Sequence, residues 1–198
     1  MRRNLVFFFL HWLLLSSAPL SAQSSPTDSQ PIALAYPVLH PDAPPETKIL
    51  SQLFGVWDAQ RTKRNRDGSW ASDSTRFEWR WYAILDGHAI QDDWIKFATN
   101  DGSAPMPQVV GTNIRIYNSD ENRWHMAWID KTNRKLATVT AKNENGTIVM
   151  SGKNAAGRPV RNTFFNIAKD QFDWRQEWTF DEGKSWVEVA KIHCIRKP

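Results

Sequence analysis

The chain has 198 residues, with 25 Lys and Arg against 21 Asp and Glu, and its formal net charge is +4. The positive charges are scattered, apart from the dense run Arg61–Arg66, and no basic stripe with stacking aromatic residues is present, which argues against a nucleic-acid-binding protein. A single cysteine, Cys194, excludes an internal disulfide, and its apolar strand context predicts a small buried side chain. The fold must therefore be held together by its core.

The N-terminus has the pattern of a cleavable export signal, over residues 1–22. Arg2 and Arg3 precede the apolar run Leu5–Leu15, and small residues follow up to a cleavage position after Ala22. The arginine pair leaves twin-arginine export open beside ordinary secretion. Because the run is too short for a membrane span, we expect a periplasmic or secreted protein with no stable membrane insertion after cleavage.

Residues 23–45 are rich in Pro and Ser and have no periodicity, which predicts a disordered linker. Residues 46–198 predict one all-β domain that starts with a short helix ending at Gly55. About ten short strand patterns with regular turn signals then follow, and the short links favour a single antiparallel up-and-down β-barrel. The expected strands cover residues 56–64, 74–85, 89–97, 110–117, 123–129, 136–142, 147–153, 160–167, 172–180 and 186–196.

Several strand patterns alternate aromatic with charged residues. With no further helices to cover a sheet, the aromatic faces must point into the barrel and the charged faces into solvent. A closed barrel also leaves no unpaired sheet edge. The inward rows expected from this alternation are Phe77, Trp79 and Trp81; Trp124, Met126 and Trp128; and Phe172, Trp174, Gln176, Trp178 and Phe180.

The two ends of the barrel pattern resemble the lipocalin/calycin superfamily. Gly55-x-Trp57 follows the helix and Arg196 closes the last strand; in that superfamily such a tryptophan packs beneath such an arginine. The resemblance implies a calycin-like barrel that binds or transforms a small molecule. Four further blocks look like a largely uncharacterised family of bacterial exported lipocalin-like domains: residues 79–94, 111–130, 151–167 and 172–186.

An aromatic interior with few polar groups predicts a site for a small hydrophobic or aromatic molecule, although the same tryptophans could fill the interior completely. Gln176 lies between tryptophans, so its buried amide needs a partner. Arg115 would bind a ligand carboxylate, as in fatty-acid-binding barrels, if it points inward rather than outward. The predicted ligand-binding residues are Phe77, Trp79, Trp81, Arg115, Trp128, Trp174, Gln176 and Trp178.

Three alternatives stay open. A barrel enzyme of the isomerase, cyclase or hydratase type would need an inward carboxylate or histidine, and Asp92 or Asp93 with His125 are the candidates. Nitrobindin-like barrels bind haem through a histidine, which here would be His193 or His125. An interaction module would have a solid core and an exposed apolar patch. We predict no metal site and no cofactor, because no two histidines have close ligand spacing.

Overall fold

The computed structural model describes residues 38–72, 74–98, 105–154 and 156–198. The predicted export signal and residues 23–37 of the predicted linker lie outside the described residues. No helix in the described part of the chain is both long and apolar enough to cross a membrane.

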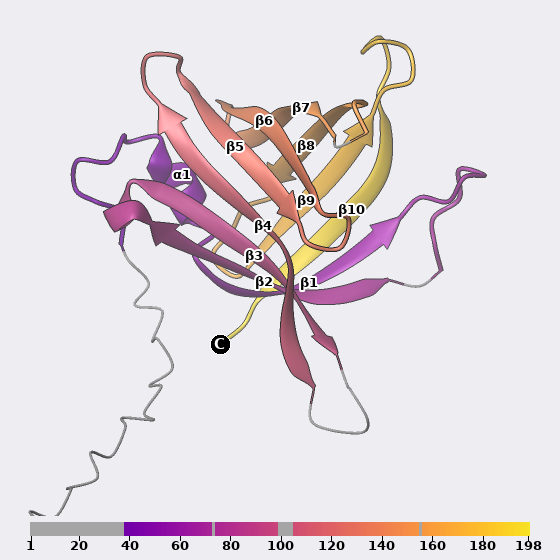
Figure 1. Ribbon diagram of the computed structural model, residues 1–198, viewed down its shortest axis with the longest axis horizontal. Helices are drawn as coiled ribbons and strands as arrows, with labels where there is room; N and C mark the ends of the chain where they lie inside the picture. Colours follow the sequence, from indigo (N-terminus) through magenta and orange to yellow (C-terminus); the bar gives the residue numbers. More distant parts are fainter. Residues whose placement is uncertain (1–37, 73, 99–104, 155) are drawn as a thin grey trace, which may run out of the picture. The chain divides into compact units, whose positions relative to one another are not determined.

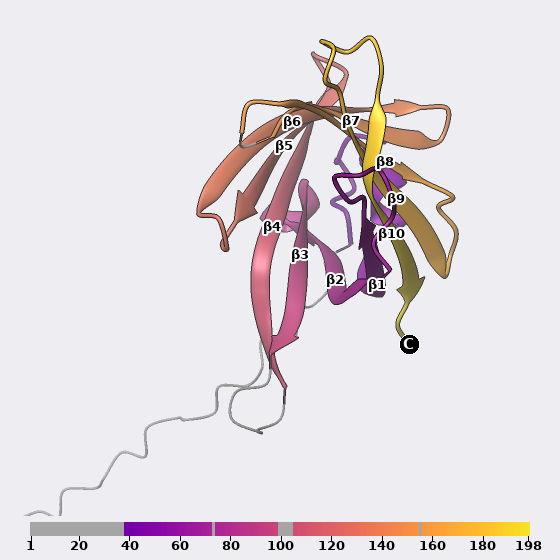
Figure 2. The ribbon, with the colours of Figure 1, turned by 90° about the vertical axis from the view of Figure 1, so that its right-hand side faces the viewer.

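Ten antiparallel strands form a closed barrel, in which each strand pairs with its sequence neighbours and β1 pairs with β10 (Figures 1 and 2). This confirms the predicted all-β, up-and-down barrel with one short helix before it. The elements are α1 (Thr47–Ser51), β1 (Gly55–Lys63), β2 (Thr75–Ile84), a 3-10 turn (Leu85–Gly87), β3 (Ala89–Ala98), β4 (Met106–Asn118), β5 (Arg123–Asp130), β6 (Lys135–Glu144), β7 (Thr147–Lys153), β8 (Pro159–Phe165), β9 (Gln171–Trp178) and β10 (Val187–Arg196).

The barrel has two unlike ends, because successive antiparallel strands run in opposite directions. The closed end holds α1, the start of β1 and the end of β10, together with the β2–β3, β4–β5, β6–β7 and β8–β9 turns. The open end holds the last residues of β1, β3, β5, β7 and β9 and the first residues of the strand that follows each of them.

Trp57 seals the closed end. Its indole Nε1 donates to the carbonyl oxygen of Leu53 at 2.7 Å, and the guanidinium carbon of Arg196 lies 4.0 Å from its ring centroid. Arg196 also donates to two backbone carbonyl oxygens in the segment after α1. A Cβ atom on Gly55 would lie 2.6 Å from Nη1 of Arg196, which explains the glycine. The arrangement implied by the lipocalin/calycin resemblance is therefore present.

The end of the predicted linker packs against the barrel. The backbone N–H of His40 donates to the carbonyl oxygen of Gly87 at 3.2 Å, and the rings of His40 and His88 stack with centroids 4.3 Å apart. For residues 38–45 the prediction of a disordered segment is therefore wrong, because a backbone hydrogen bond and a ring contact hold them on the β2–β3 turn.

The inward-facing row of β9 ends at Trp178, two residues before the predicted end at Phe180. Phe180 is 67% exposed, because β9 ends at Trp178 and a turn begins. In this turn Asp181 accepts hydrogen bonds from the hydroxyl of Thr179 at 2.7 Å and from the backbone N–H of Ser185 at 2.8 Å. The hydroxyl of Ser185 also donates to Asp181, at 2.6 Å. This bond has the largest effect, and together the bonds lower the pKa of Asp181 to about 2. The prediction that Phe180 points inward is wrong.

Candidate functional site at the open end

Aromatic side chains fill the closed half of the interior. Trp79 and Trp81 are 1% and 0% exposed, and their ring centroids lie 5.4 Å apart. Trp79 also contacts Phe164 and Phe172, at 5.8 and 5.6 Å, and Phe172 meets Trp57 edge-on at 4.7 Å. The predicted ligand residues Trp79 and Trp81 thus lie in packed core without access to solvent.

A buried ion pair lies beside these rings. Arg115 points inward and its Nη1 pairs with Oδ1 of Asp92. The other carboxylate oxygen accepts hydrogen bonds from Nε1 of Trp79 at 2.6 Å and from Nδ2 of Asn113 at 3.1 Å. The guanidinium carbon of Arg115 lies 4.3 Å from the ring centroid of Trp81. Of the two orientations that the sequence left open, the inward one is present, but Asp92 already compensates the charge.

The acid–base candidates are divided between the two sides of the sheet. Asp92 is inside, where its partners occupy both carboxylate oxygens. Asp93 faces outward and accepts a hydrogen bond from the hydroxyl of Tyr82 at 2.6 Å. His125 also lies outside, with Nε2 3.3 Å from a carboxylate oxygen of Glu121. The inward carboxylate–histidine pair sought for a barrel enzyme is not formed.

Neither histidine considered for haem faces the interior. His125 alternates with the buried Trp124 and Met126 on β5, and His193 alternates with the buried Ile192 and Cys194 on β10. The ring of His193 lies outside, 2.8 Å from Asp173. Haem ligation by either residue inside the barrel is therefore excluded. Among the described residues, no cluster of three potential metal ligands occurs either.

At the open end, inward side chains remain partly accessible to solvent. Trp94 and Trp128 are half-buried although they face the interior. The ring of Trp94 stacks on Phe77 with centroids 4.6 Å apart, and its centroid lies 5.2 Å from that of Trp128 and 6.2 Å from that of Trp174. We call Phe77, Trp94, Trp128 and Trp174 the aromatic wall.

Small side chains face the interior beside the aromatic wall. Ala137 pairs with Trp128, and Ala190 pairs with Gln176, so two alanines lie at the level of the rings. The backbone of β4 lies close to the Trp128 ring, since a Cβ atom on Gly111 would lie 2.1 Å from Cη2 of Trp128. This glycine lets the Trp128 ring rest directly on the β4 backbone.

Polar groups at this level are few. Gln176 donates to Oδ1 of Asn162 at 3.0 Å, which supplies the partner that its amide was predicted to need. The indole N–H groups of Trp94 and Trp178 are buried and have no acceptor among the described residues. Nε of Arg61, whose guanidinium carbon lies 5.6 Å from the Trp94 ring centroid, has no partner there either.

The sequence predictions missed Trp94 and Arg61. Trp94 follows Asp92 by two residues, so it shares the inward face of β3, but the choice between Asp92 and Asp93 left that face undecided. Arg61 belongs to the basic run Arg61–Arg66, to which the sequence analysis assigned no place in the barrel interior. Its position two residues after Ala59, which is fully buried, is the signal that could have identified it.

Two clefts lie away from the open end of the interior. The first, of about 510 Å³, lies at the closed end between α1 and the β4–β5 turn, with Lys48 and Tyr117 in its lining. The second, of about 450 Å³, borders the outer face of β1, β9 and β10 near Asp173 and His193. Among the described outward-facing residues that line these clefts, the only buried polar atom without a hydrogen bond is Nε of Arg175. This atom lies 3.5 Å from Oε2 of Glu177 in an ion pair.

The outer face of β4 to β6 carries four exposed aliphatic side chains. Ile114, Ile116, Ile129 and Leu136 are 36%, 47%, 41% and 59% exposed. An exposed apolar patch was the feature expected of an interaction module. The second expected feature was a solid core. At the open end, the inward-facing Trp94 and Trp128 are only half-buried.

Comparison with known proteins identifies a fold but no family. No family model and no curated protein matches the chain. The S-type phycobiliprotein lyase CPES from Guillardia theta is similar, with a TM-score of 0.52 and 11% identity over 77% of this chain and 93% of that chain. The structure of Rv2717c from M. tuberculosis has a TM-score of 0.48 and 11% identity, over 79% and 100% of the two chains. The first likeness agrees with a calycin-like barrel and, at this identity, concerns the fold alone.

Proposed function

We propose that this protein is an exported barrel that binds a small hydrophobic or aromatic molecule against the aromatic wall at its open end. One observation carries the proposal: Trp94 and Trp128 face the interior, yet solvent reaches them. Binding sites for small molecules are mostly apolar, with a few placed polar groups. The N–H of Trp94 is buried and has no acceptor among the described residues, so it would donate to an acceptor atom of the ligand.

The site supports binding more directly than catalysis. A flat ligand on the aromatic wall would gain from area burial and from ring stacking. The only inward carboxylate among the three acid–base candidates, Asp92, is occupied by Arg115, Trp79 and Asn113. A barrel of this fold serves as a phycobiliprotein lyase in Guillardia theta, but the proposal rests on the site and not on that likeness.

The neutral fluorophore N-phenyl-1-naphthylamine tests the proposal. We expect saturable binding to the purified protein, with energy transfer from tryptophan to the probe. Trp94→Leu should weaken binding about tenfold, since an aromatic contact is worth about 1 kcal/mol beyond its area. Trp186→Leu is the matched control, because Trp186 lies outside the barrel, 4.7 Å from the guanidinium of Arg161. Equal affinity in both variants, or no saturable binding, would contradict the proposal.

A further inference from the structure

Arg61 is a cation inside the open end that has no acidic partner among the described residues. It follows Trp57 and Ala59 on the inner face of β1, and it lies above the ring of Trp94 at 5.6 Å. None of the ion pairs between described residues includes it. Arg115 provides the contrast, because its charge is matched by Asp92. Of these two inward arginines, Arg61 is therefore the one whose charge is not compensated by a described acidic residue.

Two lysines extend the inward rows to which Arg61 and Trp94 belong. Lys63 lies two residues further along the same face of β1, and Lys96 lies two residues after Trp94 on β3. The charge of Arg61 is the largest cause of a lowered pKa of Lys63, followed by burial and by the charge of Lys96. Like charges lower the pKa of a lysine only when they are close and incompletely screened. Arg61 and Lys63 lie on the same face of β1, and Lys96 adds a positive charge from β3, two strands away. We call these three residues, at the rim of the aromatic wall, the cationic group.

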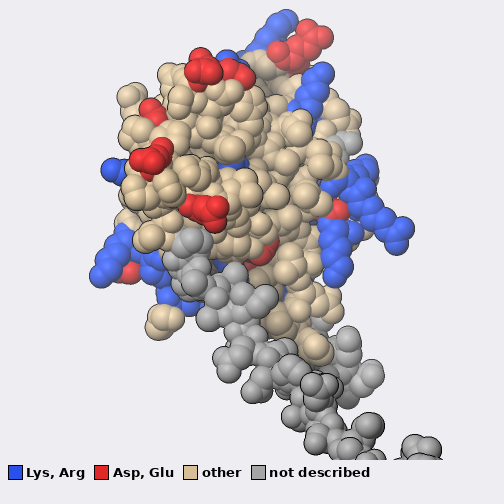
Figure 3. Space-filling view, turned by 60° about the vertical axis from the view of Figure 1, so that its left-hand side comes forward, with Lys and Arg blue, Asp and Glu red and all other residues tan. Residues whose placement is uncertain are grey.

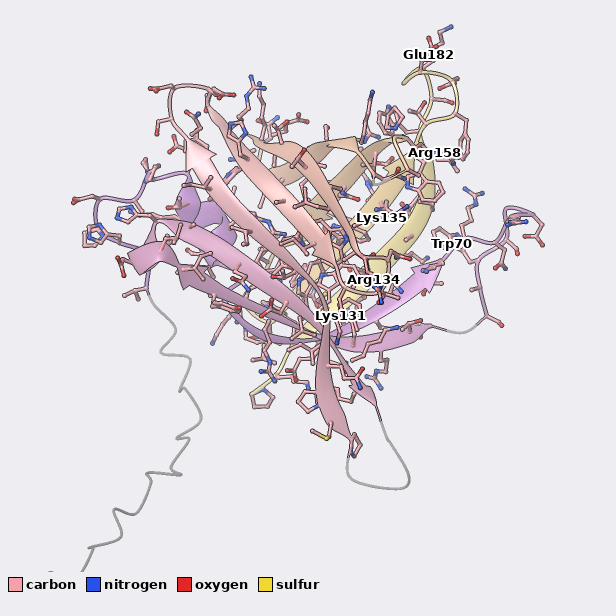
Figure 4. All side chains as sticks on the ribbon, in the orientation of Figure 1. Trp70, Lys131, Arg134, Lys135, Arg158 and Glu182 are labelled. Atoms are coloured by element: carbon pink, nitrogen blue, oxygen red, sulfur yellow. The ribbon has the colours of Figure 1, made fainter. Side chains whose placement is uncertain are left out.

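The surrounding turns strengthen this positive field. Figure 4 places Lys131, Arg134, Lys135 and Arg158 on the side of the barrel away from α1, with the acidic Glu182 at its edge. Among the described residues of the open-end connections and adjoining strand ends, the bases are Arg64, Arg66, Lys131, Arg134, Lys135, Lys153, Arg158 and Lys184, and the acids are Asp67, Asp130, Asp181 and Glu182.

The closed end has the opposite tendency. When that end is turned forward, as in Figure 3, acidic side chains lie within the visible face and most basic ones lie at its edges. Counted in the same way, its described residues carry the acids Asp42, Glu46, Asp86, Asp120, Glu121, Glu144 and Asp170 against the bases Lys48, Arg123, Lys169, Arg196 and Lys197. Among the described residues, the difference in charge between the two ends favours small anions at the open end.

We propose that the cationic group binds the acidic head of the ligand while the ligand's hydrophobic or aromatic body lies on the aromatic wall. The ligand class is then a small aromatic or hydrophobic acid, with a carboxylate or sulfonate as its head. The Arg61 guanidinium is already partly desolvated beside Trp94, so an anion gains a charge-assisted hydrogen bond for a modest loss of hydration. This inference rests on the proposed function and specifies its substrate class.

Two fluorophores with the same ring system separate the contribution of the acidic head to binding from that of the aromatic body. 8-Anilinonaphthalene-1-sulfonate carries a sulfonate, and N-phenyl-1-naphthylamine is its neutral counterpart. We expect the sulfonate to bind wild-type protein about tenfold more tightly at low salt, because a hydrogen bond to a charged group has about this value. Added salt should narrow the difference.

Arg61→Gln should remove most of this preference. It should leave the affinity for the neutral probe within about twofold, the deviation expected when two sites act independently. The matched control is Arg123→Gln at the β4–β5 turn of the closed end, which should keep the preference. Should Arg61→Gln fail to fold, the double variant Lys63→Gln/Lys96→Gln changes two exposed side chains and should reduce the preference in the same direction.

The outcomes distinguish the two proposals. Equal binding of both probes to the wild type, or an unchanged preference in Arg61→Gln and in the lysine double variant, would overturn the acidic-ligand inference while the proposed function stands. Neutral-probe binding that does not depend on Trp94 would overturn the proposed function itself. A preference lost in Arg61→Gln, together with neutral-probe binding lost in Trp94→Leu, supports both.

Discussion

Asp92 and Arg115 form an ion pair inside the barrel, with side chains that are 0% and 1% exposed. Asp92→Asn would leave the Arg115 charge buried without a counter-charge. We expect this change to lower the free energy of unfolding by about 3–5 kcal/mol, the usual cost of breaking a buried pair from one side. Urea unfolding followed by tryptophan emission measures it.

The neighbouring carboxylate is the control for this experiment. Asp93→Asn changes the same residue type on the outer face, where it accepts a hydrogen bond from Tyr82. Its expected cost is about 1 kcal/mol, the net value of one such bond. The double variant Asp92→Asn/Arg115→Met should also recover much of the loss, because it removes both charges. Similar costs at positions 92 and 93 would contradict the prediction.

Gly55→Ala should destabilise the closed end. Gly55 has a φ of +123°, and its added Cβ would lie 2.6 Å from Arg196, so the change combines backbone strain with displacement of the guanidinium from Trp57. We expect a loss of about 2–3 kcal/mol in thermal or urea unfolding. Gly146→Ala has φ +84° but open space around it and should cost only about 1 kcal/mol. A smaller loss at Gly55 than at Gly146 would contradict this reasoning.

Gly111→Ala should disturb the aromatic wall. The new methyl group would meet the Trp128 ring at 2.1 Å, so the ring must move off β4. We expect a changed near-ultraviolet circular dichroism spectrum and an affinity for N-phenyl-1-naphthylamine lowered about fivefold, as for one weakened aromatic contact. Gly157→Ala in the β7–β8 turn, with nothing within 4 Å, should leave the affinity unchanged. An unaltered Trp128 environment in Gly111→Ala would show that the wall tolerates the displacement.

Cys194 should make the protein less stable in alkali. Burial, with smaller contributions from Asp173 and Asp58, raises the pKa of its thiol above the ordinary 9.0. Above pH 9.0 the unfolded chain releases this proton while the folded chain keeps it, so the free energy of unfolding falls with rising pH, by up to about 1.4 kcal/mol per pH unit from this group. Urea unfolding at pH 8 and pH 10.5 should show a smaller decrease for Cys194→Ala than for the wild type, and equal decreases would refute the assignment.

Local signals were enough to predict the strands of this barrel. The two-residue alternation and the turn residues located all ten strands, because both depend on a few neighbouring residues. The inward direction of Phe77, Trp79 and Trp81 followed from the same alternation. The prediction for Phe180 was wrong because a turn held by the Asp181 side chain ends the strand at Trp178, although the alternation of residues continues to Phe180.

The candidate site was less predictable because its decisive contacts are not local. On β4 the apolar residues Ile114 and Ile116 face outward, while Arg115 is buried, which is the reverse of the ordinary hydrophobic pattern. Asp92 makes this possible by supplying the counter-charge from another strand. A single sequence does not give the register of β3 against β4, so it does not place Asp92 next to Arg115. Whether Trp94 faces inward depends on whether Asp92 or Asp93 does, and the sequence left this open.

Pairing of β1 with β10 has a consequence for the order of folding. Nine of the ten strand pairs join neighbours in sequence, but closure requires Trp57 to meet Arg196 across almost the whole domain. Contacts between distant residues carry the largest entropic cost, so we expect β10 to dock last onto a preformed curved sheet. Arg196 then bonds to carbonyl groups up to 144 positions earlier and covers Trp57. The final step of assembly and the exclusion of water from this end are one event.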